Sequence, residues 1–407
     1  MQQAWRVFLI VGVALASLSV GDLSSAATRH KPRATTTQKA APIDTTPVPT
    51  VLNPMLLVDM QSGNVLFEQA AGVPWHPASL TKLMTAYVTF EAIEAGRVTL
   101  DTRVTMSQKA VNEAPARSGL PAGDTLSLKD ALYIMLVKSA NDMAVAVAET
   151  VAGSTDAFAN EMNATASRLG LTRTHYDNVN GLPDDGQVTT ARDLAVLAID
   201  LRRTFPQYDP IFRTQMVTVG KVNLRASNKL LERFAGTTGM KTGFICASGL
   251  NLVATVDRGG KQLLAVVLGG SSERERDQMA GQLLLKGFAG DYKDSGSSVV
   301  NITDDQTTPP MDMKPLLCGK QAKAYVTARL KQFPWGLRGQ PNYLADKVEG
   351  DTYAATDLGP IGGGPTVASG TATAQPAGDD SSAEGDAAAA PDDAPAAVVP
   401  AAPTKKR

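Results

Sequence analysis

The stretch Pro77-Ala78-Ser79-Leu80-Thr81-Lys82-Leu83-Met84-Thr85 places a serine and a lysine three residues apart where an apolar repeat begins. Apolar residues recur at helical spacing from here on: Leu80, Leu83, Met84, Tyr87, Val88 and Ala92. This repeat predicts a helix. Positions i and i+3 share one face of a helix, so Ser79 and Lys82 can hydrogen-bond. The stretch therefore predicts a serine nucleophile with a lysine as its base.

Such a lysine acts as a base only where burial or a second cation destabilises its ammonium form. Lys241 of Lys241-Thr242-Gly243, which we expect to begin a strand, is the candidate for that cation. His76 and His175 have no obvious acidic partner in the sequence, so we expect both to be structural. Alone, a Ser-x-x-Lys is usually a helix cap and a Lys-Thr-Gly usually a turn.

Two further groups of residues could complete a catalytic site. Ser139 and Asn141 of Ser139-Ala140-Asn141 precede a predicted apolar helix, where they could relay a proton and hold a substrate amide, although a plain helix cap also fits. Gly243 lacks a Cβ and would let an extended peptide lie along the strand edge. The backbone N–H groups of Ser79 and Phe244 could form an oxyanion hole.

The order of predicted elements indicates the fold class. A hairpin (55–60 and 65–69) is followed by a mainly helical middle with strong helix formers over 128–151. Strands follow at 216–222, around 241, at 250–256 and at 263–268, and a helix at 273–287 ends the domain. This order predicts an α/β (α+β) fold with an antiparallel sheet covered by helices and a helical insertion subdomain.

Composition excludes several classes of protein. The 407 residues contain 39 Lys+Arg, 40 Asp+Glu and two cysteines. This balance argues against a polybasic nucleic-acid binder, and two cysteines cannot build a disulfide scaffold. The sequence has too few long apolar runs for a polytopic membrane protein. We expect no metal and no other cofactor.

The chain divides into five segments by composition. We predict a signal peptide at 1–26, a flexible linker at 27–50, the catalytic domain at 51–292, a short C-terminal extension at 293–349 and a disordered Ala/Pro/Asp-rich tail at 350–407. The signal peptide implies export to the periplasm or cell envelope, with an uncleaved N-terminal anchor as the alternative. We expect no C-terminal membrane anchor.

The wider motifs resemble the serine-type D-Ala-D-Ala carboxypeptidases, the low-molecular-mass penicillin-binding proteins. The resemblance spans about 52–290 and rests on the first stretch above and on four others: Lys138-Ser139-Ala140-Asn141-Asp142-Met143-Ala144, Asn180-Gly181-Leu182, Thr190-Ala191-Arg192-Asp193 and Gly239-Met240-Lys241-Thr242-Gly243-Phe244. It implies that the partners are peptidoglycan stem peptides, with β-lactam antibiotics as inhibitors and no nucleic acid.

The resemblance also implies roles for individual residues. Ser79 would attack the carbonyl between the two terminal D-alanines, with Lys82 as base and Ser139 as proton relay. Asn141 would hold the substrate amide and Lys241 would supply positive charge. Four residues would bind substrate: Thr242, Gly243, Phe244 and Arg276. Thr242 and Arg276 would anchor the terminal carboxylate, unless Arg276 is simply a surface arginine.

Three other functions compete with this one. A class A β-lactamase needs a glutamate to activate the deacylating water, and the segment 176–181 has none. We therefore expect penicillin to inhibit the protein rather than to be consumed quickly. A D,D-endopeptidase that cuts cross-links is a closer alternative, and a non-catalytic peptidoglycan-binding module is a distant one.

The two cysteines allow one structural hypothesis. In an oxidising compartment Cys246 and Cys318 could pair and close a loop of about 70 residues, which would stabilise the fold by roughly 3 to 4 kcal/mol. This would hold the segment 311–345 beside the strand of the Lys-Thr-Gly motif. Two unpaired thiols are the alternative.

Overall fold

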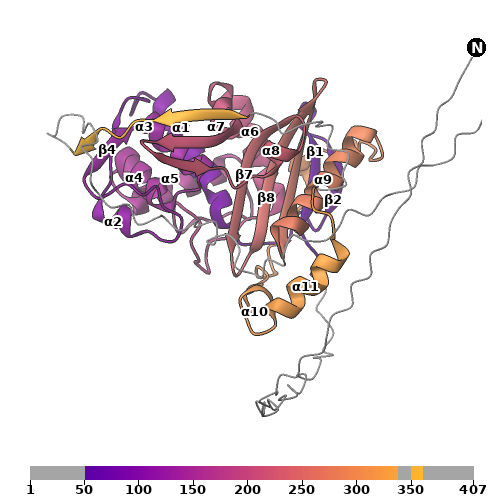
Figure 1. The fold of residues 1–407 in the computed structure, drawn as a ribbon. Coiled ribbons are helices and arrows are strands. Elements are labelled where there is room, and N and C mark those ends of the chain that lie inside the picture. Colours follow the sequence, from indigo (N-terminus) through magenta and orange to yellow (C-terminus); the bar gives the residue numbers. More distant parts are fainter. Residues whose placement is uncertain (1–50, 338–349, 361–407) are drawn as a thin grey trace, which may run out of the picture. The chain divides into compact units, whose positions relative to one another are not determined.

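A computed structural model describes residues 51–337 and 350–360, and within them five strands form one antiparallel sheet in the order β2-β1-β9-β8-β7 (Figure 1). The strands are β1 (Met55–Asp59), β2 (Val65–Gln69), β7 (Thr237–Ile245), β8 (Gly249–Arg258) and β9 (Lys261–Gly270). The hairpin predicted at 55–69 is confirmed, because β1 pairs with β2, and the strands predicted at 250–256 and 263–268 pair with each other as β8 and β9. The predicted signal peptide and linker lie outside the described residues.

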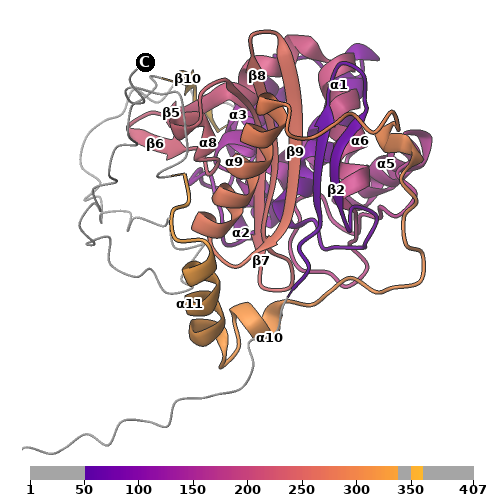
Figure 2. The same cartoon turned by 90° about the vertical axis from the view of Figure 1, so that its right-hand side faces the viewer.

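Helices cover both faces of this sheet, which explains the almost continuous apolar runs of β8 and β9 (Figure 2). Val253 and Val266 point into one core, with α1 (Thr81–Glu94) and α6 (Ala191–Thr204). Their neighbours in the strands point into a second core with α9 (Glu273–Ala289). The predicted class, an antiparallel sheet covered by helices, is confirmed.

The helical insertion begins after α1. It contains α2 (Gln108–Asn112), α3 (Leu128–Val137), α4 (Asn141–Ala152), α5 (Thr155–Arg168) and a small sheet with β3 (Arg103–Thr105) and β4 (Asp124–Ser127). The region 128–151, rich in helix formers, is two helices rather than one. The break falls at Ser139, whose positive φ of 67° cannot continue a right-handed helix.

The single turn η1 (Ala78–Leu80) lies between β2 and α1. Smaller elements lead from α6 back to the sheet: η2 (Pro206–Tyr208), α7 (Asp209–Arg213), β5 (Thr214–Val219), β6 (Val222–Arg225) and α8 (Leu230–Arg233). The prediction of one strand over 216–222 is wrong at its C-terminal end, because β5 ends at Val219 and Val222 begins β6. A turn at Gly220, with φ of 57°, separates β5 from β6, and these two strands pair antiparallel.

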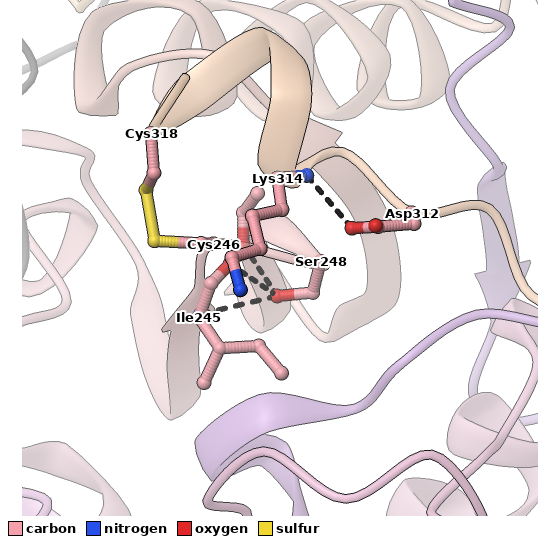
Figure 3. Close-up of a disulfide and its surroundings, with 7 residues drawn as sticks. Ile245, Cys246, Ser248, Asp312, Lys314 and Cys318 are labelled. Atoms are coloured by element: carbon pink, nitrogen blue, oxygen red, sulfur yellow. Dashed lines mark hydrogen bonds between the residues drawn. A yellow bond between two sulfur atoms is a disulfide. The ribbon is translucent and has the colours of Figure 1, made fainter.

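After α9 the chain packs back on the domain through η3 (Val299–Asn301), α10 (Lys314–Leu317) and α11 (Ala322–Gln332). Cys246 and Cys318 form a disulfide, so the alternative of two free thiols is wrong (Figure 3). The backbone N–H of Met313 also donates to the carbonyl of Ala247 at 2.9 Å. The disulfide thus fixes α10 to the end of β7, as hypothesised. The domain boundary at residue 292 stays a prediction.

The prediction of disorder from residue 350 is wrong for its first part. β10 (Asp351–Ala355) pairs parallel with β5, and β11 (Gly359–Pro360) pairs with β4. Tyr353 provides the packing that composition alone did not indicate. Residues 361–407 lie outside the described part of the chain. Among the helices of the described ranges, none is both long and apolar enough to span a bilayer.

Candidate active site

Ser79 lies in the single turn η1, directly before α1. Ala78 precedes it with a positive φ of 49°, a costly conformation for a residue with a Cβ. The Nζ of Lys82, one turn on, donates to Ser79 Oγ at 3.1 Å. The structure therefore joins the two residues through the hydrogen bond that their spacing predicts.

Lys82 is completely buried, and two further acceptors hold its Nζ. Asn141 Oδ1 lies at 2.7 Å and the backbone carbonyl of Asn180 at 2.6 Å. Asn180 was not among the predicted site residues. Asn180 belongs to the stretch Asn180-Gly181-Leu182, one of those that carry the family resemblance. Only the fold reveals that its backbone carbonyl faces Lys82.

A second lysine–serine pair involves Ser139 and Lys241. The Nζ of Lys241 donates to Ser139 Oγ at 2.8 Å and to the carbonyl of Thr242 at 2.9 Å. Ser139 and Lys241 are both buried. Since Ser139 and Asn141 are two residues apart, the junction between α3 and α4 contributes to both lysine environments. The predicted candidates Ser79, Lys82, Ser139, Asn141 and Lys241 therefore form one cluster.

The Lys-Thr-Gly motif lies inside β7 rather than at its start, so that expectation is wrong. A Cβ at Gly243 would lie 2.9 Å from the nitrogen of Ser79 and 3.1 Å from that of Leu80. The space left by the missing side chain is thus occupied by η1. Gly243 allows the turn that contains Ser79 to lie against β7, with Phe244 next in the strand.

Thr242 has a partner that sequence reasoning missed. Its Oγ1 lies 2.5 Å from Ser227 Oγ. Both residues line a pocket with Lys241, Asn228 and apolar residues of α3 and α7. Ser227 follows β6 by two residues and carries no local motif, so only the tertiary structure identifies it. The hydroxyl pair and the ammonium together offer hydrogen-bond donors for an anion.

Arg276 lies on α9 and is 1% exposed, which rules out the surface-arginine alternative. Its Nε donates to Asp277 Oδ1 at 2.9 Å. Burial raises the pKa of Asp277, while the Arg276 guanidinium acts in the opposite direction. The role of Arg276 as a carboxylate anchor stays a prediction.

The histidines have other partners. His76 is buried with Nδ1 3.0 Å from the carbonyl of Gln187. His175 does have an acidic neighbour, since its Nε2 lies 3.1 Å from Asp177 Oδ1, so the expectation that it lacks one is wrong. In the two described ranges, no group of three His, Cys, Asp or Glu side chains is arranged to hold a metal ion.

The fold has clear relatives among solved structures. Penicillin-binding protein 6B from Escherichia coli is 33% identical with a TM-score of 0.55, over 60% of this chain and 80% of that one. Penicillin-binding protein D2 from Listeria monocytogenes in its cefotaxime-bound form is 30% identical with a TM-score of 0.54, over 59% and 99%. The fold is therefore that of penicillin-binding proteins and serine β-lactamases.

Comparison of the sequence identifies the family more narrowly than the fold does. The family model described as D-alanyl-D-alanine carboxypeptidase, peptidase family S11, matches residues 47–272, and the chain belongs to that family. The D-alanyl-D-alanine carboxypeptidase DacC of Escherichia coli K12 is 38% identical over 240 residues, which are 57% of this chain and 60% of DacC. DacF of Bacillus subtilis is 30% identical, over 58% and 61%. The chain thus spans about 60% of the length of these curated relatives.

Proposed function

We propose that the protein is a serine D,D-carboxypeptidase that removes the terminal D-alanine from peptidoglycan stem pentapeptides. One observation carries this proposal: the buried Lys82 joins Ser79 to Asn141 and Asn180, and the Lys241–Ser139 pair lies in the same cluster. Membership of the D-alanyl-D-alanine carboxypeptidase family supports the same substrate.

In the acylation step Ser79 Oγ attacks the carbonyl carbon between the two D-alanines. Lys82, in its neutral form, accepts the hydroxyl proton. The peptide bond breaks, and the departing nitrogen receives a proton through Ser139. Free D-alanine leaves, and the remaining peptide is an ester on Ser79.

The backbone arrangement supports stabilisation of the developing oxyanion. Gly243 packs against the nitrogen of Ser79, which brings β7 beside η1. The N–H groups of Ser79 and Phe244 would then donate to the oxyanion. Thr242, with Ser227 and Lys241 beside it, would bind the terminal carboxylate, and Arg276 would be its second anchor. The rest of the stem peptide would extend along the edge of β7.

The same ester chemistry would make β-lactams inhibitors, because their ring opening acylates Ser79. The relative from Listeria monocytogenes was solved with cefotaxime bound. Export to the periplasm or cell envelope completes the proposal, since the substrate lies there. The predicted signal peptide supports export, and a disulfide is typical of oxidising compartments.

The experiment is to follow D-alanine release from a stem pentapeptide and cleavage of cross-linked stem-peptide dimers by the full-length protein and its Ser79→Ala variant. Release of D-alanine by the wild type alone is the expected result. Cleavage of dimers without D-alanine release would instead establish an endopeptidase. Equal release by the Ser79→Ala variant would contradict the proposed nucleophile.

A further inference from the structure

The short segment 113–116, which follows α2, contacts Asn141 and Asn180, two of the residues that accept from Lys82. Glu113 Oε2 accepts a hydrogen bond from Asn180 Nδ2 at 3.1 Å. The carbonyl of Ala116 accepts from the backbone N–H of Asn141 at 2.7 Å, and that of Ala114 from Asn141 Nδ2 at 3.5 Å. One segment of the insertion therefore contacts two of the three residues that accept from Lys82.

Glu113 is the charged member of this segment. Its half-buried carboxylate reaches Asn180 across 67 positions of sequence. The other end of the Asn180 side chain makes a local contact, because Oδ1 accepts from the N–H of Leu182 at 3.1 Å. Both ends of the Asn180 side chain are thus held, one by Glu113 and one by Leu182. Glu113 therefore fixes the orientation of Asn180, whose carbonyl faces Lys82.

Acylation changes what holds Lys82. In the free protein Ser79 Oγ, Asn141 Oδ1 and the Asn180 carbonyl all accept from its Nζ. Once Ser79 Oγ becomes an ester oxygen it is a weaker acceptor, so the position of Lys82 depends on Asn141 and Asn180. The second half of the reaction is therefore more sensitive to the orientation of Asn180 than the first half.

We propose that Glu113 is a positioning residue for hydrolysis of the acyl-enzyme, an inference that rests on the proposed function. In that step the oxygen of water bonds to the acyl carbon, and neutral Lys82 takes the proton from the water. The bond between the acyl carbon and Ser79 Oγ breaks, and Oγ receives the proton from Lys82. Glu113 holds Lys82 at the reacting oxygen through Asn180.

Glu113 also bears on the difference from class A β-lactamases, which use a glutamate to activate the deacylating water. The segment 176–181 contains no glutamate. The fold brings a glutamate to Asn180 from a different part of the chain, the loop after α2. Glu113 therefore sets how long a penicilloyl group stays on Ser79.

The test measures formation and decay of the adduct with a fluorescent penicillin on the full-length protein. Glu113→Ala should form the adduct within about threefold of the wild-type rate and lose it about tenfold more slowly, which is less than the roughly 100-fold effect of a 1 Å misplacement because Asn141 still holds Lys82. Glu113→Gln keeps an acceptor oxygen and should decay at nearly the wild-type rate. Glu149→Ala, which removes a partly exposed glutamate at the other end of α4, should match the wild type.

Other outcomes separate the alternatives. Wild-type decay in Glu113→Ala would overturn the inference while leaving the proposed function intact. Decay as slow in Glu113→Gln as in Glu113→Ala would mean that the carboxylate itself takes the proton, which overturns the positioning role. No adduct on the wild type would overturn the proposed function. If Glu113→Ala does not fold, Asn180→Ala must show the same slow decay, and a wild-type rate there would overturn the inference.

Discussion

Tyr353 of β10 stacks on Tyr133 of α3, with ring centroids 3.5 Å apart and ring planes 3° from parallel. The Tyr353 hydroxyl donates to Asp130 Oδ1 at 2.7 Å, and Asp130 lies on the same helix as Tyr133. Because α3 ends at Val137, two residues before Ser139, β10 stabilises the helix that leads into the candidate active site.

Replacing Tyr353 should therefore lower the free energy of unfolding. Tyr353→Ala loses the ring pair and the hydrogen bond, together about 2 kcal/mol, whereas Tyr353→Phe loses the hydrogen bond alone, about 1 kcal/mol. Urea unfolding of the three proteins measures both values. Equal stability of Tyr353→Ala and the wild type would show that β10 does not contribute to the folded domain.

The disulfide between Cys246 and Cys318 closes a loop whose ends are 72 residues apart. In the chain-entropy model its loss costs about 4 kcal/mol. The Cys246→Ser, Cys318→Ser double variant should show this loss in urea unfolding without reductant. Reduced wild type should match the double variant, and a double variant as stable as the oxidised wild type would contradict the estimate.

The raised pKa of Asp193 should make the free energy of unfolding depend on pH. Burial, and next the charge of Asp304, raise the pKa of Asp193 to about 6, although Arg192 donates to its Oδ1 at 2.7 Å. Two buried carboxylates share this guanidinium, since Arg192 also lies 3.9 Å from Asp304. The folded protein holds the Asp193 proton more tightly than the unfolded chain does, so its contribution to stability falls as the pH rises from about 4 to about 6.

The measurement compares urea unfolding of the wild type and Asp193→Asn between pH 4 and pH 7. Asparagine does not titrate, so the stability of the wild type relative to the variant should decrease from about pH 4 to about pH 6 and level off above that. A difference that is constant with pH, or that increases, would show that the pKa of Asp193 is not raised.

Gly243 tests the contact between β7 and η1. A Cβ there would lie 2.9 Å from the nitrogen of Ser79, a backbone atom that cannot move away as a side chain could. Gly243→Ala should displace the turn that contains Ser79 and reduce the rate of penicillin acylation by about 100-fold, the effect expected of a 1 Å misplacement. Gly259→Ala is the control for lost stability: its Cβ would meet nothing within 4 Å, but its φ of 61° strains an alanine, so this variant should lose stability and keep the wild-type rate of acylation.

If Gly243 instead serves only to admit a peptide along the strand edge, the Gly243→Ala variant should acylate with penicillin at the wild-type rate and lose activity on the pentapeptide alone. Comparing the two substrates on the same protein distinguishes the two reasons for a glycine at this position.

Sequence patterns predicted the parts of the site that depend on local spacing. Ser79 and Lys82 lie one helical turn apart, so their hydrogen bond follows from the helix itself. The Lys241–Ser139 contact needs the fold, yet both residues belong to motifs and could be proposed in advance. Arg276 was expected from the family resemblance, while its burial could not be predicted from a charged stretch of sequence.

The remaining contacts depend on tertiary structure and have no local signal. Asn180 acts through its backbone carbonyl, which every residue type possesses. Ser227 and Glu113 reach the site from loops that no motif marks. β10 was missed because a single aromatic residue, Tyr353, supplies packing that the average composition of its segment conceals.

The proposed role of Ser79 as nucleophile is open to one decisive measurement: the full-length wild type and Ser79→Ala are incubated with penicillin, and the adduct is located by peptide mass spectrometry. We expect one penicilloyl group, on the peptide that contains Ser79, and no adduct on the variant. An adduct on another residue, or one that forms equally on Ser79→Ala, would contradict that role.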